Sequence, residues 1–476
     1  MRYPAFTPIT TARAMVLASL LPAVVFAEPP LPGPVPPSPA EPAVLPQAAA
    51  LVSASQHVPE TLPQEVTLAE VLAYALAHNT QTRTTWLAAR AAAADLGRKR
   101  SSLYPAVDAS VAVARQSQWA LGGRFGFQQT TYGPALSVSY LLLDFGGRSA
   151  KIEEAFQGLI AADFAHNAAL QEVVYRVQQA YFSYLGAQAL RDAADASLGE
   201  ARTFLEAAEA RKAVGLATAL DVLQARTAVA QAELARASLE GQVETVRGAL
   251  ATAMGLPATV PLNVRAVLPE IRELAAAESV EKLVAQALAQ RPEVQQARAR
   301  ELAAQAKVKE MRAEGLPSLV FSGSANRTYY IPETTKSHSD NWSLGVALRF
   351  PLFTGFDRTY AIRQAQEQAE QARAGREATE QQAILDVWTA YYQLQTAKSR
   401  LAAAAELLET ARKTQEVAAG RYKEGVGSML DLTQAQATLA QARAEEVRAR
   451  ADYLLALAGL ARSTGTLELP VRESER

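Results

Sequence analysis

The 476-residue sequence contains no cysteine and carries almost no net charge, with 47 basic side chains set against 48 acidic ones. Without cysteine the chain forms no disulfide, no thiolate metal site and no cysteine nucleophile. The charge balance gives no reason to expect nucleic acid as a partner. The four histidines lack metal-ligand spacing, and no motif of nucleotide-binding proteins, metalloproteases or serine hydrolases occurs. We therefore expect no enzyme, no metal and no cofactor.

Long apolar runs are also scarce, and the one that stands out lies at the N-terminus. Residues 14–27 read "AMVLASLLPAVVFA", with two arginines before them and the small residues Val25 and Ala27 at the positions of a cleavage site. This run is too short to cross ~30 Å of hydrocarbon as a helix. We predict that residues 1–27 are a signal peptide, and we expect no lipid anchor at a junction without cysteine.

Prolines crowd the segment that follows. Residues 28–46 read "EPPLPGPVPPSPAEPAVLP", a composition that blocks helix and sheet pairing and favours an extended, solvated tether. We predict a linker over residues 28–64. No later apolar run is long enough for a membrane-spanning helix, so a membrane location would require a closed β-barrel.

The rest of the chain is duplicated. The stretches "RKAVGLATALDVLQAR" (211–226) and "RYKEGVGSMLDLTQAQ" (421–436) match at an offset of 431 − 221 = 210 positions. The matched pairs include Arg211 with Arg421, Gly215 with Gly425, Asp221 with Asp431, and Gln224 with Gln434. We predict one copy at 67–256, a second at 279–466, a joining segment at 257–278 and a tail at 467–476. An offset this large indicates a duplicated half and not a solenoid.

Each copy contains two runs with alternating apolar residues. We predict β-hairpins at 105–143 and 317–353, with strands near the ~9–11 residues that cross a bilayer as a tilted strand. Aromatic residues gather at the strand ends, as in the girdle of a membrane barrel; they are Trp119, Phe125, Phe127, Tyr329, Tyr330 and Trp342. An ordinary half-buried sheet would show the same alternation.

Long helices follow the hairpins. Residues 147–212 contain no proline, and a helix of this length would span about 95 Å. Apolar residues at spacings of three and four form coiled-coil seams; they are Ile362, Ala365, Ala369 and Ala372, and on the return helix Leu432, Ala435, Leu439 and Ala442. Glycines at the exits of the hairpins, Gly146, Gly147 and Gly355, indicate bends from strand to helix. A solvated helical bundle would fit the seams but not the hairpins.

Four strands in one chain are too few to close a membrane barrel, which needs at least about eight. An open sheet would expose unpaired edges to lipid. We therefore expect an oligomer that shares one barrel, and three copies would supply 3 × 4 = 12 strands.

Over residues 67–466 the chain resembles the TolC-like outer membrane efflux proteins. The resemblance rests on the order and duplication of several short motifs. They are "AHN" and "AQRPEV" at the repeat starts, "LYP" and "LP" before the strands, "LLLDFGGR" and "RFPLFTGFDR" after them, and the turns "VGLATALD" and "EGVGSMLD". It implies an α+β membrane protein, a homotrimer whose 12-stranded outer-membrane β-barrel, with four strands per chain, continues into a long α-helical coiled-coil barrel in the periplasm.

The same resemblance implies a passive exit duct for small molecules or proteins, located in the outer membrane of a Gram-negative bacterium. Expected partners are a periplasmic adaptor protein, an inner-membrane pump of the RND or ABC type, and outer-membrane lipid. The helix turns would dock the adaptor through Gly215, Leu216, Gly425, Val426 and Gly427. The sequence does not distinguish drugs, metals and proteins as cargo, because the pump selects it.

The resemblance also suggests a role for the repeated aspartates. It implies that Asp431 lines the periplasmic aperture, with Asp221, Gln434 and Tyr422 beside it. The residues themselves leave another interpretation open, in which each aspartate is a helix N-cap. Because Gln434 and Gly427 replace charged residues of the family's type member, a gate held by ionic links is doubtful.

Two functions from different classes therefore remain. The first is an outer-membrane duct completed by a pump. The second is a periplasmic coiled-coil scaffold without a channel, whose hairpins form an ordinary sheet. Outer-membrane location separates the two.

Overall fold

The computed structural model describes residues 31–36, 38–42, 66–120, 125–264, 279–331 and 337–467. The predicted signal peptide and most of the predicted linker, joining segment and tail lie outside these ranges. Residues 32–36 and 38–42, within the linker, contradict the expectation of a solvated tether. Trp86 Nε1 donates a hydrogen bond to the Pro36 carbonyl, and Pro36 is buried.

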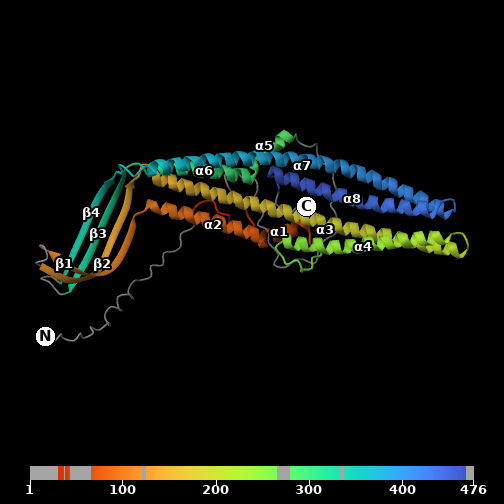
Figure 1. The fold of residues 1–476 in the computed structure, drawn as a ribbon, viewed down its shortest axis with the longest axis horizontal. Coiled ribbons are helices and arrows are strands. Elements are labelled where there is room, and N and C mark those ends of the chain that lie inside the picture. The colour runs from red at the N-terminus through yellow and green to blue at the C-terminus, as the bar shows by residue number, and fades with distance from the viewer. Residues whose placement is uncertain are drawn as a thin grey trace, which may run out of the picture. The chain divides into compact units, whose positions relative to one another are not determined.

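Both copies follow one order of elements: two consecutive helices, a strand hairpin, a very long helix and a return helix (Figure 1). Copy one comprises α1 (Leu68–His78), α2 (Thr80–Arg100), the short 3₁₀ helix η1 (Ser101–Leu103), β1 (Ala106–Ala120), β2 (Phe125–Leu143), α3 (Gly147–Ala213) and α4 (Ala219–Ala253). Copy two comprises α5 (Val280–Gln290), α6 (Pro292–Ala313), β3 (Ser318–Ile331), β4 (His338–Arg349), α7 (Asp357–Lys423) and α8 (Met429–Thr464).

The long helices α3 and α7 have 67 residues each, which corresponds to about 100 Å of helix. The strands lie at one end of them, and the α3–α4 and α7–α8 turns lie at the other (Figure 1). None of the helices in the described ranges combines the length and apolar character needed to cross a membrane.

The four strands form one antiparallel sheet in the order β1-β2-β3-β4, so the central β2–β3 pair joins the two copies. Strands β1 and β4 are its edges. Their apolar side chains are open to solvent in the single chain: Val111 is 77% exposed and Trp342 77%. Within one chain, therefore, β1 and β4 each pair with a strand on one side only, and they carry exposed apolar side chains.

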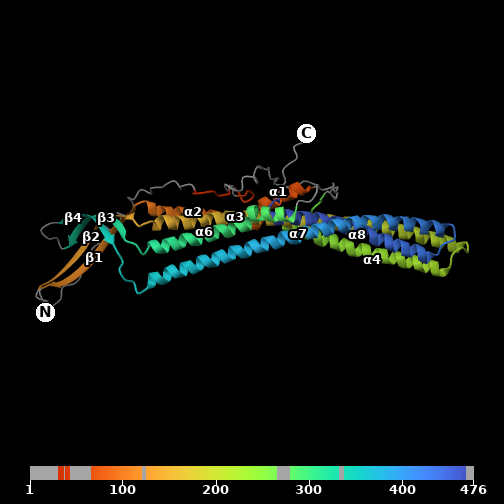
Figure 2. The same cartoon turned by 90° about the horizontal axis from the view of Figure 1, so that it is seen from above.

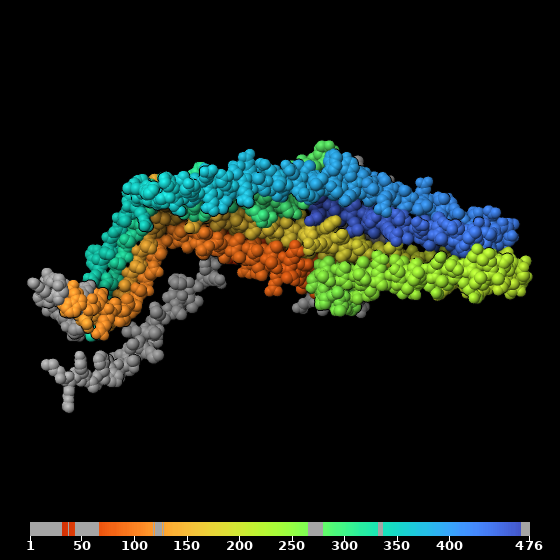
Figure 3. Space-filling view, viewed as in Figure 1, coloured from red at the N-terminus to blue at the C-terminus, as the bar shows by residue number. Residues whose placement is uncertain are grey.

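Buried alanines recur every seven positions along α7 and along its return helix α8. On α7 they are Ala383, Ala390, Ala397, Ala404 and Ala411, and on α8 they are Ala435, Ala442 and Ala449. Alanine at such positions lets two helix backbones approach closely. Figure 3 shows the α7–α8 pair alongside α3 and α4 on one face. The largest buried cluster forms where α1, α3 and α4 meet.

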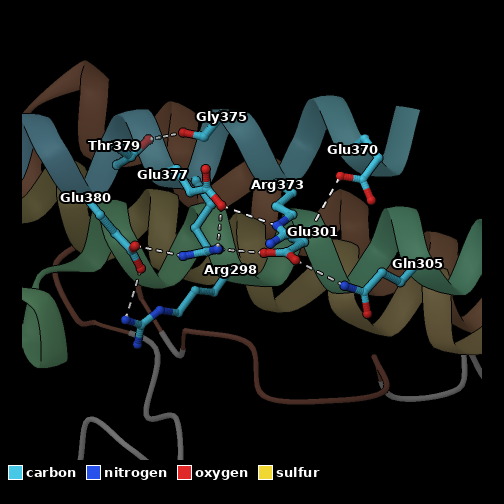
Figure 4. Close-up of polar contacts among 10 residues, drawn as sticks. Arg298, Glu301, Gln305, Glu370, Arg373, Gly375, Glu377, Thr379 and Glu380 are labelled. Carbon is cyan, nitrogen blue, oxygen red and sulfur yellow. Dashed lines mark hydrogen bonds and ion pairs between the residues drawn. The ribbon is translucent and has the colours of Figure 1, made fainter. Parts of the chain in front are cut away.

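Helix α6 lies between α3 and α7 (Figure 2) and is fixed to α7 by charged residues. Arg376 of α7 contacts Glu301 of α6 at 2.6 Å and Glu380 of its own helix at 2.7 Å, while Arg298 of α6 reaches Glu380 at 3.2 Å (Figure 4). Opposite charges thus face each other across the α6–α7 contact, and Glu380 is shared between two arginines, one from each helix.

A left-handed glycine ends each return helix against the first corner of its own copy. Gly255 follows α4 with φ +86, and Gly465 follows α8 with φ +77. A Cβ on Gly255 would lie 3.2 Å from the His78 carbonyl oxygen and 3.3 Å from Asn79 Cα. A Cβ on Gly465 would lie 3.1 Å from Arg291 Cα. The backbones themselves are in contact, so both positions require glycine.

We expect Gly255→Ala to destabilise the protein more than Gly215→Ala. Both glycines adopt the left-handed conformation, with φ +86 and +77, so alanine costs about 1–2 kcal/mol at either position. Only at Gly255 would the new methyl group also press on a neighbouring backbone, which adds roughly 1–3 kcal/mol. Nothing lies within 4 Å of a Cβ at Gly215, which makes it a matched control.

The measurement is the midpoint of thermal unfolding, followed by circular dichroism at one scan rate on the detergent-solubilised protein. Equal shifts for the two variants would contradict the close contact at Gly255.

Candidate functional site at the helix turns

Both long helices end in the same hydrogen-bonded turn. At the end of α3, Gly215 has φ +77 and its N–H donates to Lys212 O, while the N–H of Leu216 donates to Arg211 O. Gly425 and Val426 repeat this pattern at the end of α7. These are Schellman motifs, in which a left-handed glycine lets the last free carbonyls find donors. Left-handed glycines therefore cap both long helices.

The aspartates after the turns are not the N-caps that their sequence position suggested. The N-caps are Thr218 for α4 and Ser428 for α8, and Asp221 and Asp431 occupy the third helical position of a capping box. Asp221 accepts from the Thr218 N–H at 2.7 Å. Asp431 accepts from the Ser428 N–H at a longer 3.4 Å and is exposed. The second aspartate is thus held less tightly by its own helix.

The two turns pack against each other through a small apolar cluster. Tyr422, Met429 and Leu432 of copy two are buried against residues of copy one, namely Ala208, Val222 and Ala225. Burial raises the pKa of the Tyr422 phenol, and the nearby Asp221 charge adds to the rise while Arg211 opposes it. The Tyr422 hydroxyl has no hydrogen-bond partner within the described ranges.

Arg211 connects the two copies, and sequence reasoning did not identify it as a site residue. Its Nη1 donates to the carbonyls of Tyr422 at 3.0 Å and Lys423 at 2.9 Å, at the C-terminal end of α7. Its guanidinium also lies 5.1 Å from the centre of the Tyr422 ring. A cation at a helix C-terminus interacts favourably with the helix dipole and the free carbonyls. The only signal in the sequence was a basic residue four positions before the glycine.

The equivalent arginine of copy two behaves differently. Arg421 Nη2 lies 3.4 Å from the Val426 carbonyl within its own turn. A Cβ on Gly427 would lie 3.0 Å from Arg421 Cβ, so this position has little room for a side chain. The link between the turns is therefore made by the arginine of copy one.

Asp431 and Gln434, predicted together, share a groove of about 330 Å³ on α7 and α8 with Arg421 and Gly427. Gln434 also lines a larger groove of about 730 Å³ between α3, α4 and α8, together with Gln224, its equivalent in copy one. Tyr422 and Asp221 belong instead to the contact between the turns. Of the four residues predicted for the aperture, Asp431 and Gln434 thus line a surface groove, whereas Asp221 and Tyr422 lie where the two turns pack together.

The predicted bends after the hairpins carry left-handed residues. Gly146 precedes α3 with φ +95, next to Phe145 with φ +50, and Gly147 begins the helix. Gly355 has φ +62 and Phe356 φ +66 before α7. A cluster of three or more metal-ligating side chains does not occur within the described ranges.

Both copies match the model of one protein family, described as outer membrane efflux protein, over residues 71–256 and 283–466. Protein CyaE of Bordetella pertussis is 30% identical over 329 residues, which are 69% of this chain and 69% of CyaE. The probable efflux pump outer membrane protein SepC of Pseudomonas putida is 28% identical over 291 residues, or 60% of this chain and 59% of SepC.

A solved structure shows the same fold. The open state of the MtrE outer membrane channel of Neisseria gonorrhoeae superposes with a TM-score of 0.72 at 23% identity, covering 88% of this chain and 98% of that one. The family model covers both copies, in agreement with the resemblance to TolC-like proteins. The chain belongs to the outer membrane efflux protein family.

Proposed function

We propose that this protein is the passive outer-membrane exit duct of a tripartite efflux pump and that it works as a homotrimer. The observation that carries the proposal is the family match to both copies, each of which holds one hairpin and one long helix pair. The names of relatives such as SepC point to a pump as the setting. The proposed partners are a periplasmic adaptor and an inner-membrane pump of the RND or ABC type.

The open sheet supports assembly into a trimer. Strands β1 and β4 leave two free edges in one chain, and their exposed apolar side chains fit contact with lipid. Three chains would close the edges as a barrel of 3 × 4 = 12 strands, with the long helices continuing as a barrel in the periplasm. Exposed Trp119 and Trp342 would then lie where aromatic girdles meet the membrane interface.

The helix turns support a gate at the periplasmic end. In a trimer, three exposed Asp431 side chains around the axis would repel one another and attract cations. The Arg211 contact with the end of α7 would hold the two turns of each chain together, in place of ionic links through positions 427 and 434. Gly215, Leu216, Gly425, Val426 and Gly427 form the turn surfaces that we propose for adaptor docking.

Cysteine crosslinking tests the trimer. Because the chain has no cysteine, Val111→Cys in β1 can be combined in turn with Gly345→Cys, Val346→Cys or Ala347→Cys in β4 to sample the register. At least one pair should yield covalent dimers and trimers, and nothing larger, in outer-membrane fractions. Each single variant is the control, and it should give no trimer. Only dimers, or a ladder beyond three, would contradict a closed ring of three chains.

Conductance in planar bilayers tests Asp431. Asp431→Asn keeps the shape of the side chain and removes its charge, so we expect the small wild-type conductance to lose its preference for cations. Gln434→Ala, in the same groove but uncharged, serves as the control and should keep that preference. An unchanged ion selectivity in Asp431→Asn would return this residue to a purely capping role.

The same bilayers test the Arg211 link. A hydrogen bond from a charged donor contributes roughly 1.5–3 kcal/mol, so Arg211→Ala should shift the closed state toward the open one about tenfold or more. Arg421→Ala, the equivalent change in copy two, should leave the conductance near the wild-type value. If both variants behave alike, the link does not hold the turns closed.

A further inference from the structure

A short proline-rich segment is seated on α2 and α3. This segment, here called the strap, comprises residues 32–36 and 38–42 and is drawn in red in Figure 2. Trp86 of α2 donates to the Pro36 carbonyl at 2.9 Å, and His166 Nε2 of α3 lies 2.9 Å from the Glu41 carbonyl. The strap thus joins the two helices that flank the first hairpin.

The strap contacts α3 at Gly33, whose left-handed backbone favours glycine. Gly33 has φ +97, and a Cβ there would lie 2.5 Å from Leu159 Cδ2. Val35 packs beside it against a small buried cluster of Ala93, Leu96 and Leu159. This part of the strap therefore packs closely against α2 and α3.

Asp163 lies between the two places where the strap contacts α3. It follows Leu159 by four positions and precedes His166 by three, so all three residues share one helix face. Asp163 is 0% exposed, and neither carboxylate oxygen has a hydrogen-bond partner in the described part of the chain. Prolines have no N–H, and half of the strap's ten residues are proline, so the strap has few donors to offer.

In the described part of the chain, no charged side chain compensates Asp163. On its own helix the pKa of His166 is lowered by burial, and its Nδ1 lies 2.9 Å from the Thr85 hydroxyl of α2. Arg90 of α2 stacks on Trp86, 4.8 Å from the ring centre, and the Glu41 carboxylate accepts from Ser38 at 3.1 Å.

Two charged residues on the neighbouring helix α6 are also engaged elsewhere. Arg298 and Glu301 pair with Glu380 and Arg376 of α7 (Figure 4). Burial thus raises the pKa of Asp163 to about 8. A neutral carboxyl is stable in this position, whereas a carboxylate would have neither donors nor a counter-charge.

We propose that the strap is a proton-controlled clasp, which closes over α2 and α3 while the Asp163 carboxyl is protonated and lifts when that carboxyl ionises. When the strap lifts, water reaches Asp163 and solvates the carboxylate. The strap cannot do this because it has few hydrogen-bond donors. The proposal concerns the outer face of one chain and does not depend on the gate at the helix turns.

The direction of the pH effect follows from the two pKa values of Asp163. With the strap closed the pKa is about 8, and with water admitted it returns toward the ordinary value of 3.8. The closed state therefore binds the proton more tightly, and closure weakens as pH rises from about 4 to 8. For one proton, the open-to-closed ratio rises up to about tenfold per pH unit.

His166 acts in the opposite direction. Its pKa is lowered from 6.5 by burial, so closure weakens as pH falls below 6.5. The two residues oppose each other below that value, and between pH 6.5 and 8 Asp163 acts alone. This window is where the proposal is tested.

The test is electron paramagnetic resonance of a nitroxide label on the full chain in detergent. Pro34→Cys supplies a single attachment site because the chain has no other cysteine. Between pH 6.5 and 8 the ratio of mobile to immobile label should rise by up to about tenfold per pH unit. With Asp163→Asn added, the ratio should stay flat. A label at Gly199→Cys, on an exposed part of α3, should not respond in either background and reports on folding.

Two further variants separate the contributions. Asp163→Leu removes the ionisable group with a side chain of similar shape, and should keep the strap closed from pH 6.5 to 8 even if Asp163→Asn folds poorly. His166→Gln should retain the rise above pH 6.5. A wild-type ratio that does not change, a rise that persists without Asp163, or a rise that disappears in His166→Gln would each overturn the proposal.

Discussion

The close approach of helix backbones along α3 and α7 is the constraint on which the rest of the structure depends. A helix of 67 residues cannot be buried in one compact core, so its stability comes from neighbours along its length. A buried alanine at every seventh position lets the return helix α8 lie close to α7. At the turns, Schellman motifs end α3 and α7 and capping boxes begin α4 and α8, so terminal carbonyl and N–H groups find partners there.

The two copies share a backbone plan and differ in the side chains that connect them. Each return helix ends in a left-handed glycine that touches a corner, formed by Asn79 in copy one and by Arg291 in copy two. At the turns, Arg211 crosses to the other copy while Arg421 stays in its own turn. Duplication thus supplies the frame, and even matched arginines make different contacts in the two halves.

Sequence reasoning succeeded where a feature is local and repeated. Alternation over 105–143 and 317–353 and the glycines of the turns depend on near neighbours, and the structure has strands and left-handed glycines there. The interpretation of Asp221 and Asp431 as N-caps, one of the two left open, was wrong, because Thr218 and Ser428 also suit an N-cap and occupy that position.

Features that depend on distant parts of the chain were missed. Arg211 contacts the carbonyl of a residue 211 positions away, which no local pattern encodes. The strap was expected to be solvated, because proline composition does not reveal that Trp86 and His166 bond to its carbonyls.

As a member of the outer membrane efflux protein family, this protein is an outer-membrane transport component and not an enzyme. The central claim is that three chains close one barrel and bring Asp431 to a common axis. Electron cryomicroscopy of the protein in lipid nanodiscs tests it most directly. The account predicts threefold symmetry, twelve paired strands within the lipid and three Asp431 side chains at the narrowest point. A single chain, another symmetry, or hairpins outside the lipid would contradict it.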